Sequence, residues 1–141
     1  MKIGMTINTS AVMAALKKAK PSPRTTERAL GRAASGHILD MLKRVDSGVG
    51  LNGRFKPYHP EYAKYRAKKG RGTNAVNLQF KGEMLKDVTL KTTSPTKAVV
   101  GFVQEIERKK AMGTHKQRPW FGVNNHEEKQ ILSRFKREIF R

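Results

Sequence analysis

The sequence of 141 residues contains no cysteine. This absence excludes a disulfide framework and a thiolate metal site, and it removes the thiol from the candidate nucleophiles. The apolar runs in the sequence are short, and none approaches the length of a membrane span or of a secretory signal. We therefore expect a protein that is made and kept in the cytosol and that has no membrane partner.

Acidic residues are scarce: 11 Asp and Glu stand against 30 Lys and Arg, which gives a formal net charge of +19. No acid occurs in residues 1–26 or between Glu61 and Glu83, and a basic cluster begins at Arg108. A single charge run usually marks a solvated face, but several patches together indicate attraction to polyanions. The residues expected to face DNA or another polyanion are Lys64, Arg66, Lys68, Lys69, Arg71, Arg108, Lys109 and Lys110.

Patterns that carry catalysis are missing as well. His37, His59, His115 and His126 lie in four separate segments, and no phosphate-binding loop, serine elbow or zinc-helix motif occurs. His59 beside Pro60 raises the idea of a general base, but a turn histidine at a helix start is the expected role. We predict no catalytic residue, no cofactor and no metal ion, and we keep a nuclease or other enzyme only as the least favoured alternative.

Recognised nucleic-acid-binding modules are also absent from the sequence, including helix-turn-helix, zinc-finger and aromatic RNP patterns. We therefore do not expect the sequence-specific binding that such modules provide. A basic protein that binds nucleic acid independently of sequence remains an alternative, because phosphate contacts require only positive charge.

Hydrophobic periodicity predicts an α+β fold with N-terminal helices, a small antiparallel sheet built on a central hairpin, and a C-terminal helix. The first half should contain a strand over residues 2–7, a helix over 11–18 that two prolines stop, a long helix from Thr25 or Thr26 to Val45, and a helix over 61–69. Residues 46–57 form a connection that orders against a partner. We expect one domain over residues 1–141, divided into an arm (1–24) and a core (25–141).

The second half should begin with a hairpin, because residues 88–92 alternate and residues 97–103 are β-branched. Residues 104–117 are polar and basic, and they give no assignable pattern. A last helix should begin at Asn124 or Asn125, with Ile131, Leu132, Phe135 and Ile139 on its inner face.

Two aromatic groups have more than one interpretation. Tyr58, Tyr62 and Tyr65 repeat at helical spacing, which favours core packing over a platform for stacked nucleobases. Trp120 and Phe121 stand between Pro119 and Gly122 just before the last helix, and we expect them to pack in the core, with a subunit contact as the alternative.

Several short motifs occur in an order that resembles the phage virion-morphogenesis family, which includes tail-completion and neck proteins. They are residues 59–69 (HPEYAKYRAKK), residues 78–88 (LQFKGEMLKDV), a second strand ending near Gly101, and residues 118–122 (RPWFG) before a helix. Two positions depart from the family pattern. Lys81 stands where threonine is usual, and only Gln104 remains of a His-Gln-Phe-Gly step.

The resemblance implies a structural virion protein rather than an enzyme. It implies a homo-oligomeric ring, sixfold or twelvefold, at the head–tail junction or tail end. Such a ring would bind neighbouring neck, portal-side or tail-tube proteins, and it could contact phage DNA non-specifically. The residues that it assigns to assembly are Gly82, Met84, Arg118, Pro119, Trp120, Phe121 and Gly122.

Overall fold

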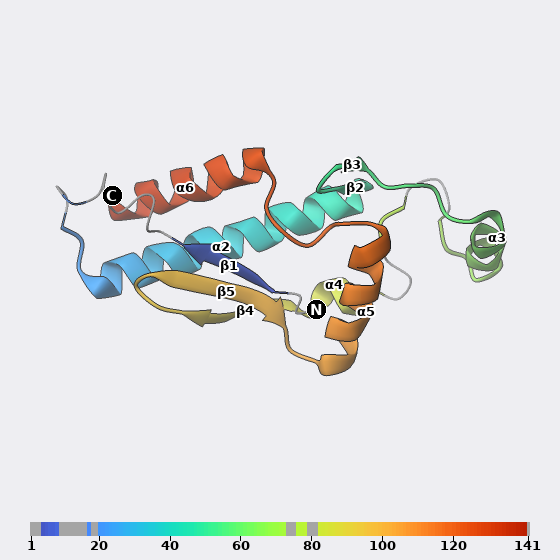
Figure 1. Ribbon diagram of the computed structural model, residues 1–141, viewed down its shortest axis with the longest axis horizontal. Helices are drawn as coiled ribbons and strands as arrows, with labels where there is room; N and C mark the ends of the chain where they lie inside the picture. The colour runs from blue at the N-terminus through green and yellow to red at the C-terminus, as the bar shows by residue number, and fades with distance from the viewer. Residues whose placement is uncertain (1–3, 9–16, 18–19, 73–75, 79–81, 141) are drawn as a thin grey trace.

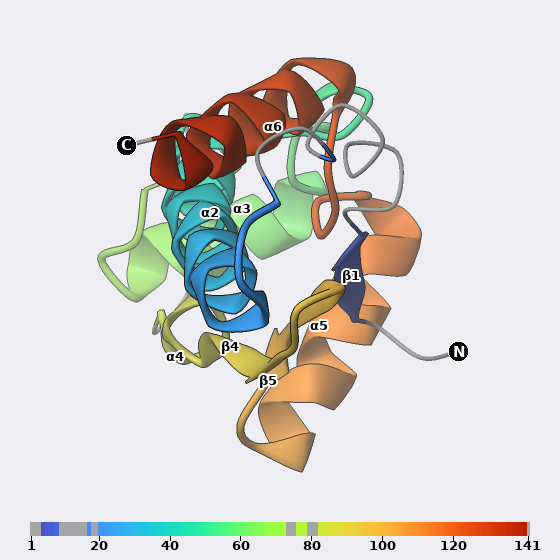
Figure 2. The same ribbon diagram turned by 90° about the vertical axis from the view of Figure 1, so that its left-hand side faces the viewer.

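The computed structural model describes residues 4–8, 17, 20–72, 76–78 and 82–140. Its longest element is α2 (Pro23–Asp46), which lies between a three-stranded sheet on one side and α6 (Asn125–Ile139) on the other (Figures 1 and 2). The predicted α+β fold is confirmed. None of the helices in the described part of the chain has the length and apolar character needed to cross a membrane.

Helix α2 confirms the predicted long helix and extends it at its start. The Ser22 side chain accepts a hydrogen bond from the Thr25 N–H at 3.1 Å and caps the helix. Pro23 is the first helical residue, where its missing N–H costs nothing because that group would have no partner in the helix. The helix therefore begins before the predicted start at Thr25 or Thr26, and the helix predicted over residues 11–18 lies outside the described residues apart from Lys17.

The sheet has the strand order β1–β5–β4, and all neighbours are antiparallel. Strands β4 (Val88–Thr93) and β5 (Lys97–Phe102) form the predicted hairpin, closed by a hydrogen bond from the Ser94 N–H to the Lys97 carbonyl. Strand β1 (Met5–Asn8) pairs with β5, with Met5 opposite Val100. Residues 5–8 of the predicted arm are thus an edge strand of the core sheet.

Residues 46–57 were expected to order only against a partner, and the structure corrects this. Within them, β2 (Val49–Gly50) pairs with β3 (Gly53–Arg54), and the Leu51 N–H donates to the Pro119 carbonyl at 2.9 Å. A Cβ on Gly50 would lie 2.4 Å from that carbonyl oxygen, so only glycine permits this close approach. The small hairpin is therefore held by the same subunit.

Within the described residues there are three further helices: α3 (Pro60–Lys68), α4 (Glu83–Lys86) and α5 (Glu105–Gln117). Helix α3 matches the predicted element, whereas α5 occupies residues 105–117, for which no element was predicted. Helix α6 begins at the predicted cap, because Asn124 and Glu127 form a reciprocal capping box. Ile131 and Phe135 on its inner face are buried, and Leu132 and Ile139 pack against the core.

The core lies where α2, α6 and the sheet meet the segment before α6. Trp120 is fully buried, and its ring makes edge contacts with Phe102 and Phe121 at centroid distances of 6.3 and 5.4 Å. Leu30, Met41, Val45 and Val100 are also fully buried. This packing fixes the positions from which α3 and α5 extend.

Candidate functional site

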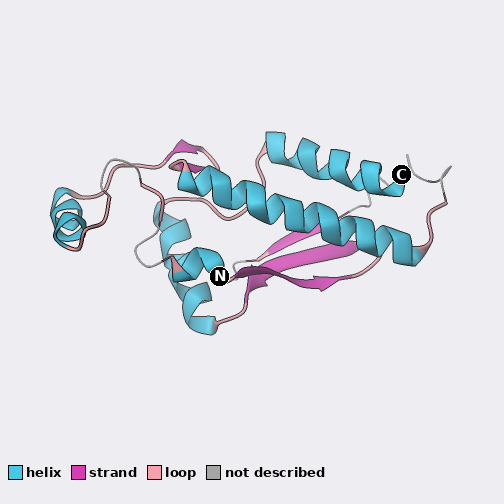
Figure 3. Ribbon diagram, turned by 180° about the vertical axis from the view of Figure 1, so that it is seen from behind, coloured by secondary structure: helices cyan, strands magenta, loops and turns pink. Residues whose placement is uncertain are grey.

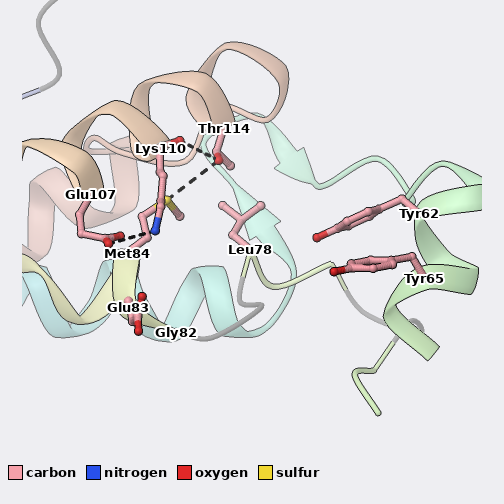
Figure 4. A pocket seen from close by; sticks show the side chains of 9 residues that line it. All are labelled: Tyr62, Tyr65, Leu78, Gly82, Glu83, Met84, Glu107, Lys110 and Thr114. Carbon is pink, nitrogen blue, oxygen red and sulfur yellow. Dashed lines mark hydrogen bonds and ion pairs between the residues drawn. The ribbon is translucent and has the colours of Figure 1, made fainter. Parts of the chain in front are cut away.

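Helix α3 projects from the body at one end of the long axis of the molecule (Figures 1 and 3). Between it and a wall formed by α4 and α5 lies a groove of about 460 Å³ (Figure 4). A second hollow of about 370 Å³ shares three of its lining residues, Tyr62, Leu78 and Thr114. The two hollows therefore adjoin, and together we call them the groove beside α3.

The α3 side of the groove is an aromatic cluster with interleaved cations. Tyr62 lies 5.2 Å from Tyr58 in an edge contact and 6.2 Å from Tyr65 in a stacked one, between ring centroids. The Arg66 guanidinium lies 4.6 Å from the centre of the Tyr58 ring. Arg118 approaches the same ring at 5.5 Å. Such cation–π contacts fix the aromatic rings relative to α3.

These tyrosines do not belong to the core, so the prediction that they pack there is wrong. Tyr62 and Tyr65 keep 41% and 47% of their surface exposed. Figure 4 shows both side chains reaching into the groove toward Leu78 and Met84. The helical spacing correctly places them on one face of α3, but that face meets the groove rather than the packed interior.

The opposite wall combines apolar surface with one ion pair. Met84 is buried, with its sulfur 4.0 Å from the Thr114 hydroxyl, and Lys110 Nζ lies 3.1 Å from the Glu107 carboxylate. The groove thus offers aromatic faces, hydroxyls, a thioether and a neutralised charge pair (Figure 4). This combination suits contact with another molecule, because aromatic and methionine side chains are enriched where proteins dock.

The segment before α6 anchors the base of the α3 projection. Arg118 donates hydrogen bonds to the carbonyls of Lys56 and Pro57, each at 3.2 Å. Trp120 and Phe121 are buried in the core, which confirms the core interpretation and makes their assignment to an assembly surface wrong for the subunit. Pro119 and Gly122 are half-buried, and Gly82 and Met84 line the groove.

A buried polar network holds this segment against α2 and α6. Arg44 contacts the Glu127 carboxylate at 3.1 Å through Nε and the Trp120 carbonyl at 3.1 Å through Nη2. His37 Nε2 lies 3.0 Å from the Gly122 carbonyl. Since both charged side chains of the ion pair are at most 9% exposed, each depends on the other for charge compensation.

Two of the histidines contact this segment. Burial lowers the pKa of His37, although the nearby Glu127 carboxylate acts in the opposite direction. Burial also lowers the pKa of His115, whose Nδ1 accepts hydrogen bonds from the Trp120 and Phe121 N–H groups at 3.3 Å each. The two therefore contact one segment, from α2 and from α5, which their distant sequence positions did not reveal.

The other two histidines lie at helix starts. His59 Nδ1 accepts a hydrogen bond from the Glu61 N–H at 3.3 Å and caps α3, which confirms the predicted turn role. His126 is exposed in the first turn of α6. Among the described residues, no three His, Cys, Asp or Glu side chains come together in a way that could hold a metal ion.

The predicted polyanion-facing residues separate into different environments. Lys64, Lys68, Lys69 and Arg71 are exposed along the α3 projection. Arg66 is only 3% exposed and donates to the Gly72 carbonyl at 2.9 Å, so its prediction as a DNA-facing residue is wrong.

In α5, Lys109 is exposed and Arg108 is half-buried. Arg108 binds Glu105 and holds the pKa of that carboxyl below its usual range, mainly through the hydrogen bond between them. Lys110 is engaged with Glu107. The structure therefore brings the α3 cations together, but it offsets two of the three predicted cations of α5 with acids of the same helix.

Comparisons with protein-family models, with curated proteins and with solved structures returned no match. The groove and its surroundings therefore have to be interpreted from their own geometry. The sequence revealed the tyrosine face and residues 118–122, but not that α5 forms the opposite wall, because that segment showed no apolar stripe.

Proposed function

We propose that this chain is a structural subunit of a tailed-phage virion, which forms a ring of tail-completion or neck type by docking to copies of itself and to neighbouring virion proteins. The groove beside α3 carries the proposal. Tyr62 and Tyr65 project there from an element that packs little against its own subunit, opposite the motif residues Gly82 and Met84. A short isolated helix with an exposed aromatic face gains stability when another molecule covers it.

The order of elements supports the same proposal. Residues 82–87 lead through α4 into β4, β5 contains Gly101, and residues 118–122 lead into α6. This is the order that the resemblance to the virion-morphogenesis family implies. Identical subunits in a ring contact their two neighbours through two different surfaces. The projecting helix α3 and the groove beside it can provide one of these surfaces.

The test compares two variants of the full-length protein. Tyr62→Ala/Tyr65→Ala removes the aromatic face, whereas Leu39→Ala removes an exposed apolar side chain from α2 and serves as the control. We expect native mass spectrometry and negative-stain microscopy to show rings for the wild type and the control, and single subunits for the double variant. Rings that form equally well in all three proteins would show that the groove is not the docking site.

A complementary test uses the phage that encodes the chain. Particles assembled without the protein should have heads and tails that do not join, or tails with faulty ends. Normal infectious particles would reject the proposal.

A second candidate function rests on the net charge of +19. A basic protein that binds nucleic acid independently of sequence would retain duplexes at low salt and lose affinity steeply as salt rises. In that case the free subunit binds DNA and no ring forms, so the same mass-spectrometry experiment separates the two candidates.

A further inference from the structure

The exposed face of α2 carries a straight row of arginines. Arg24, Arg28 and Arg32, which we call the α2 ridge, follow one another at four-residue spacing, and all three are exposed. Since an α-helix rises 1.5 Å per residue, the ridge is about 12 Å long. The same face continues through Ser35 and Leu39 to Lys43, about 28 Å from Arg24, without an acidic residue.

A shallow groove of about 570 Å³ runs beside the ridge, between α2 and the edge strand β4. All three arginines line it. The single acid among its lining residues, Glu27, accepts a hydrogen bond from Thr93 Oγ1 at 3.4 Å. Gly31 lies between the arginines and leaves the wall without a side chain, so the charged side chains that line the groove are three cations and one acid.

Folding does not account for this row. Like charges four residues apart destabilise a helix by about 0.2–0.5 kcal/mol per pair, and cations near its N-terminus oppose the macrodipole. The first turn of α2 contains no acid that would compensate. Arg24 and Arg28 form no ion pair within the described part of the chain, and Arg32 pairs with Glu138 at 2.7 Å while its side chain stays 54% exposed.

We propose that the α2 ridge and its groove bind the phosphate backbone of duplex DNA without sequence preference. Guanidinium groups contact phosphate oxygens through two parallel hydrogen bonds, which makes arginine suited to this role. The 28 Å face corresponds to about eight base pairs at 3.4 Å each. The proposal goes beyond the docking function proposed above and does not depend on it, because it is argued from the charges of α2 and the groove beside them.

The composition of the face favours nucleic acid over an acidic protein. Protein interfaces usually have an apolar or aromatic centre from which charged residues are depleted. Here the groove is lined by charged and small side chains with Leu90 as its one large apolar residue, and the ridge contains no aromatic ring. Evenly spaced cations match a regularly charged backbone.

The experiment measures anisotropy of a labelled 20-base-pair duplex of arbitrary sequence over a series of salt concentrations. Arg24→Gln/Arg28→Gln is compared with Lys64→Gln/Lys68→Gln, which removes the same charge from exposed positions of α3. Each lost phosphate contact lowers the slope of log affinity against log salt by about 0.9. We expect the ridge variant to lose about 1.8 in slope and at least about tenfold in affinity at 0.1 M salt, and the α3 variant to lose less than half as much.

Equal losses in the two double variants would overturn the assignment, because they would show that net charge alone governs binding. Absence of salt-dependent binding by the wild type would overturn it as well. A third result would overturn it too: polyglutamate of equal charge that binds the wild type as tightly as the duplex does and loses affinity in the ridge variant. The occupant of the ridge would then be an acidic polypeptide. Native mass spectrometry of the same samples reports ring formation separately, so a failure here is distinguishable from a failure of the proposed ring.

Discussion

Replacing Glu127 by glutamine should destabilise the protein far more than the same replacement at its neighbour Glu128. Both acids lie in the first turn of α6. The Glu127 side chain is 5% exposed and accepts hydrogen bonds from Arg44 at 3.1 Å and from the Asn124 N–H at 3.2 Å. Glu128 is exposed. Removing one partner of a buried ion pair typically costs about 3–5 kcal/mol, because the remaining charge stays buried without compensation.

Glutamine keeps one carbonyl oxygen as an acceptor, so we expect the lower end, about 3 kcal/mol for Glu127→Gln. In thermal unfolding this corresponds to a decrease in Tm of about 10 °C for a chain of this size. Glu128→Gln removes only a favourable interaction with the helix macrodipole and should cost less than about 1 kcal/mol. Urea unfolding followed by Trp120 fluorescence measures both variants.

A further variant separates charge from packing. Arg44→Met combined with Glu127→Gln removes both charges, so the protein should regain part of the stability lost in the single variant. Equal destabilisation by Glu127→Gln and Glu128→Gln, or a double variant less stable than the sum of the single changes, would refute the reasoning about the buried pair.

Three other predictions concern the fold and the α2 ridge. Gly50→Ala should destabilise the protein, because the added Cβ would lie 2.4 Å from the Pro119 oxygen. In Gly113→Ala, by contrast, the added Cβ in α5 meets no atom within 4 Å, so urea unfolding should show a gain in stability of about 0.5–1 kcal/mol. Burial lowers the pKa of His37 from 6.5, so the unfolded chain binds the imidazole proton more tightly than the folded protein does. The free energy of unfolding should therefore fall as the pH drops through 6.5. A His37→Gln variant should show a weaker dependence on pH. Arg28→Glu converts two repulsive pairs in α2 into attractive ones; it should raise stability by about 0.5–1 kcal/mol and weaken duplex binding, and equal binding to the wild type would contradict the ridge assignment.

Elements with strong local signals were predictable from the sequence. In α2 the apolar residues recur at helical spacing, and Leu30, Met41 and Val45 are all fully buried. The start of helix α6 was predictable because Asn124 and Glu127, which form its capping box, lie within four residues of sequence. The hairpin is equally local, since a proline turn joins two short β-branched runs.

Helix α5 could not be predicted in the same way. Its buried residues are Glu107 and Ala111, so it shows no apolar stripe, and its polar composition resembles that of a loop. The Gln104 N–H before its start donates to the Asp87 carboxylate at 2.8 Å, a contact between residues 17 positions apart. Tertiary contacts of this kind determine where the helix begins, and no local pattern encodes them.

The candidate site depends even more on contacts between distant residues. Helical spacing grouped Tyr58, Tyr62 and Tyr65, but it could not show whether the body or another molecule covers that face. Arg66 belongs to the same cluster because its guanidinium lies over Tyr58, which a count of charges cannot reveal. His37 meets the Gly122 carbonyl across 85 positions of sequence.

The two environments of arginine in this chain connect its fold with its proposed function. Arg44 and Arg66 are enclosed, and each is offset by a carboxylate, carbonyl groups or an aromatic ring of the same subunit. Arg24 and Arg28 lie on the outer face of α2, where cations only weaken the helix. Identical subunits with a formal charge of +19 repel one another, and a polyanion along this face would reduce the repulsion as it binds. If both proposals hold, bound DNA would favour assembly through the α2 ridge, and the groove beside α3 would provide the contacts between proteins.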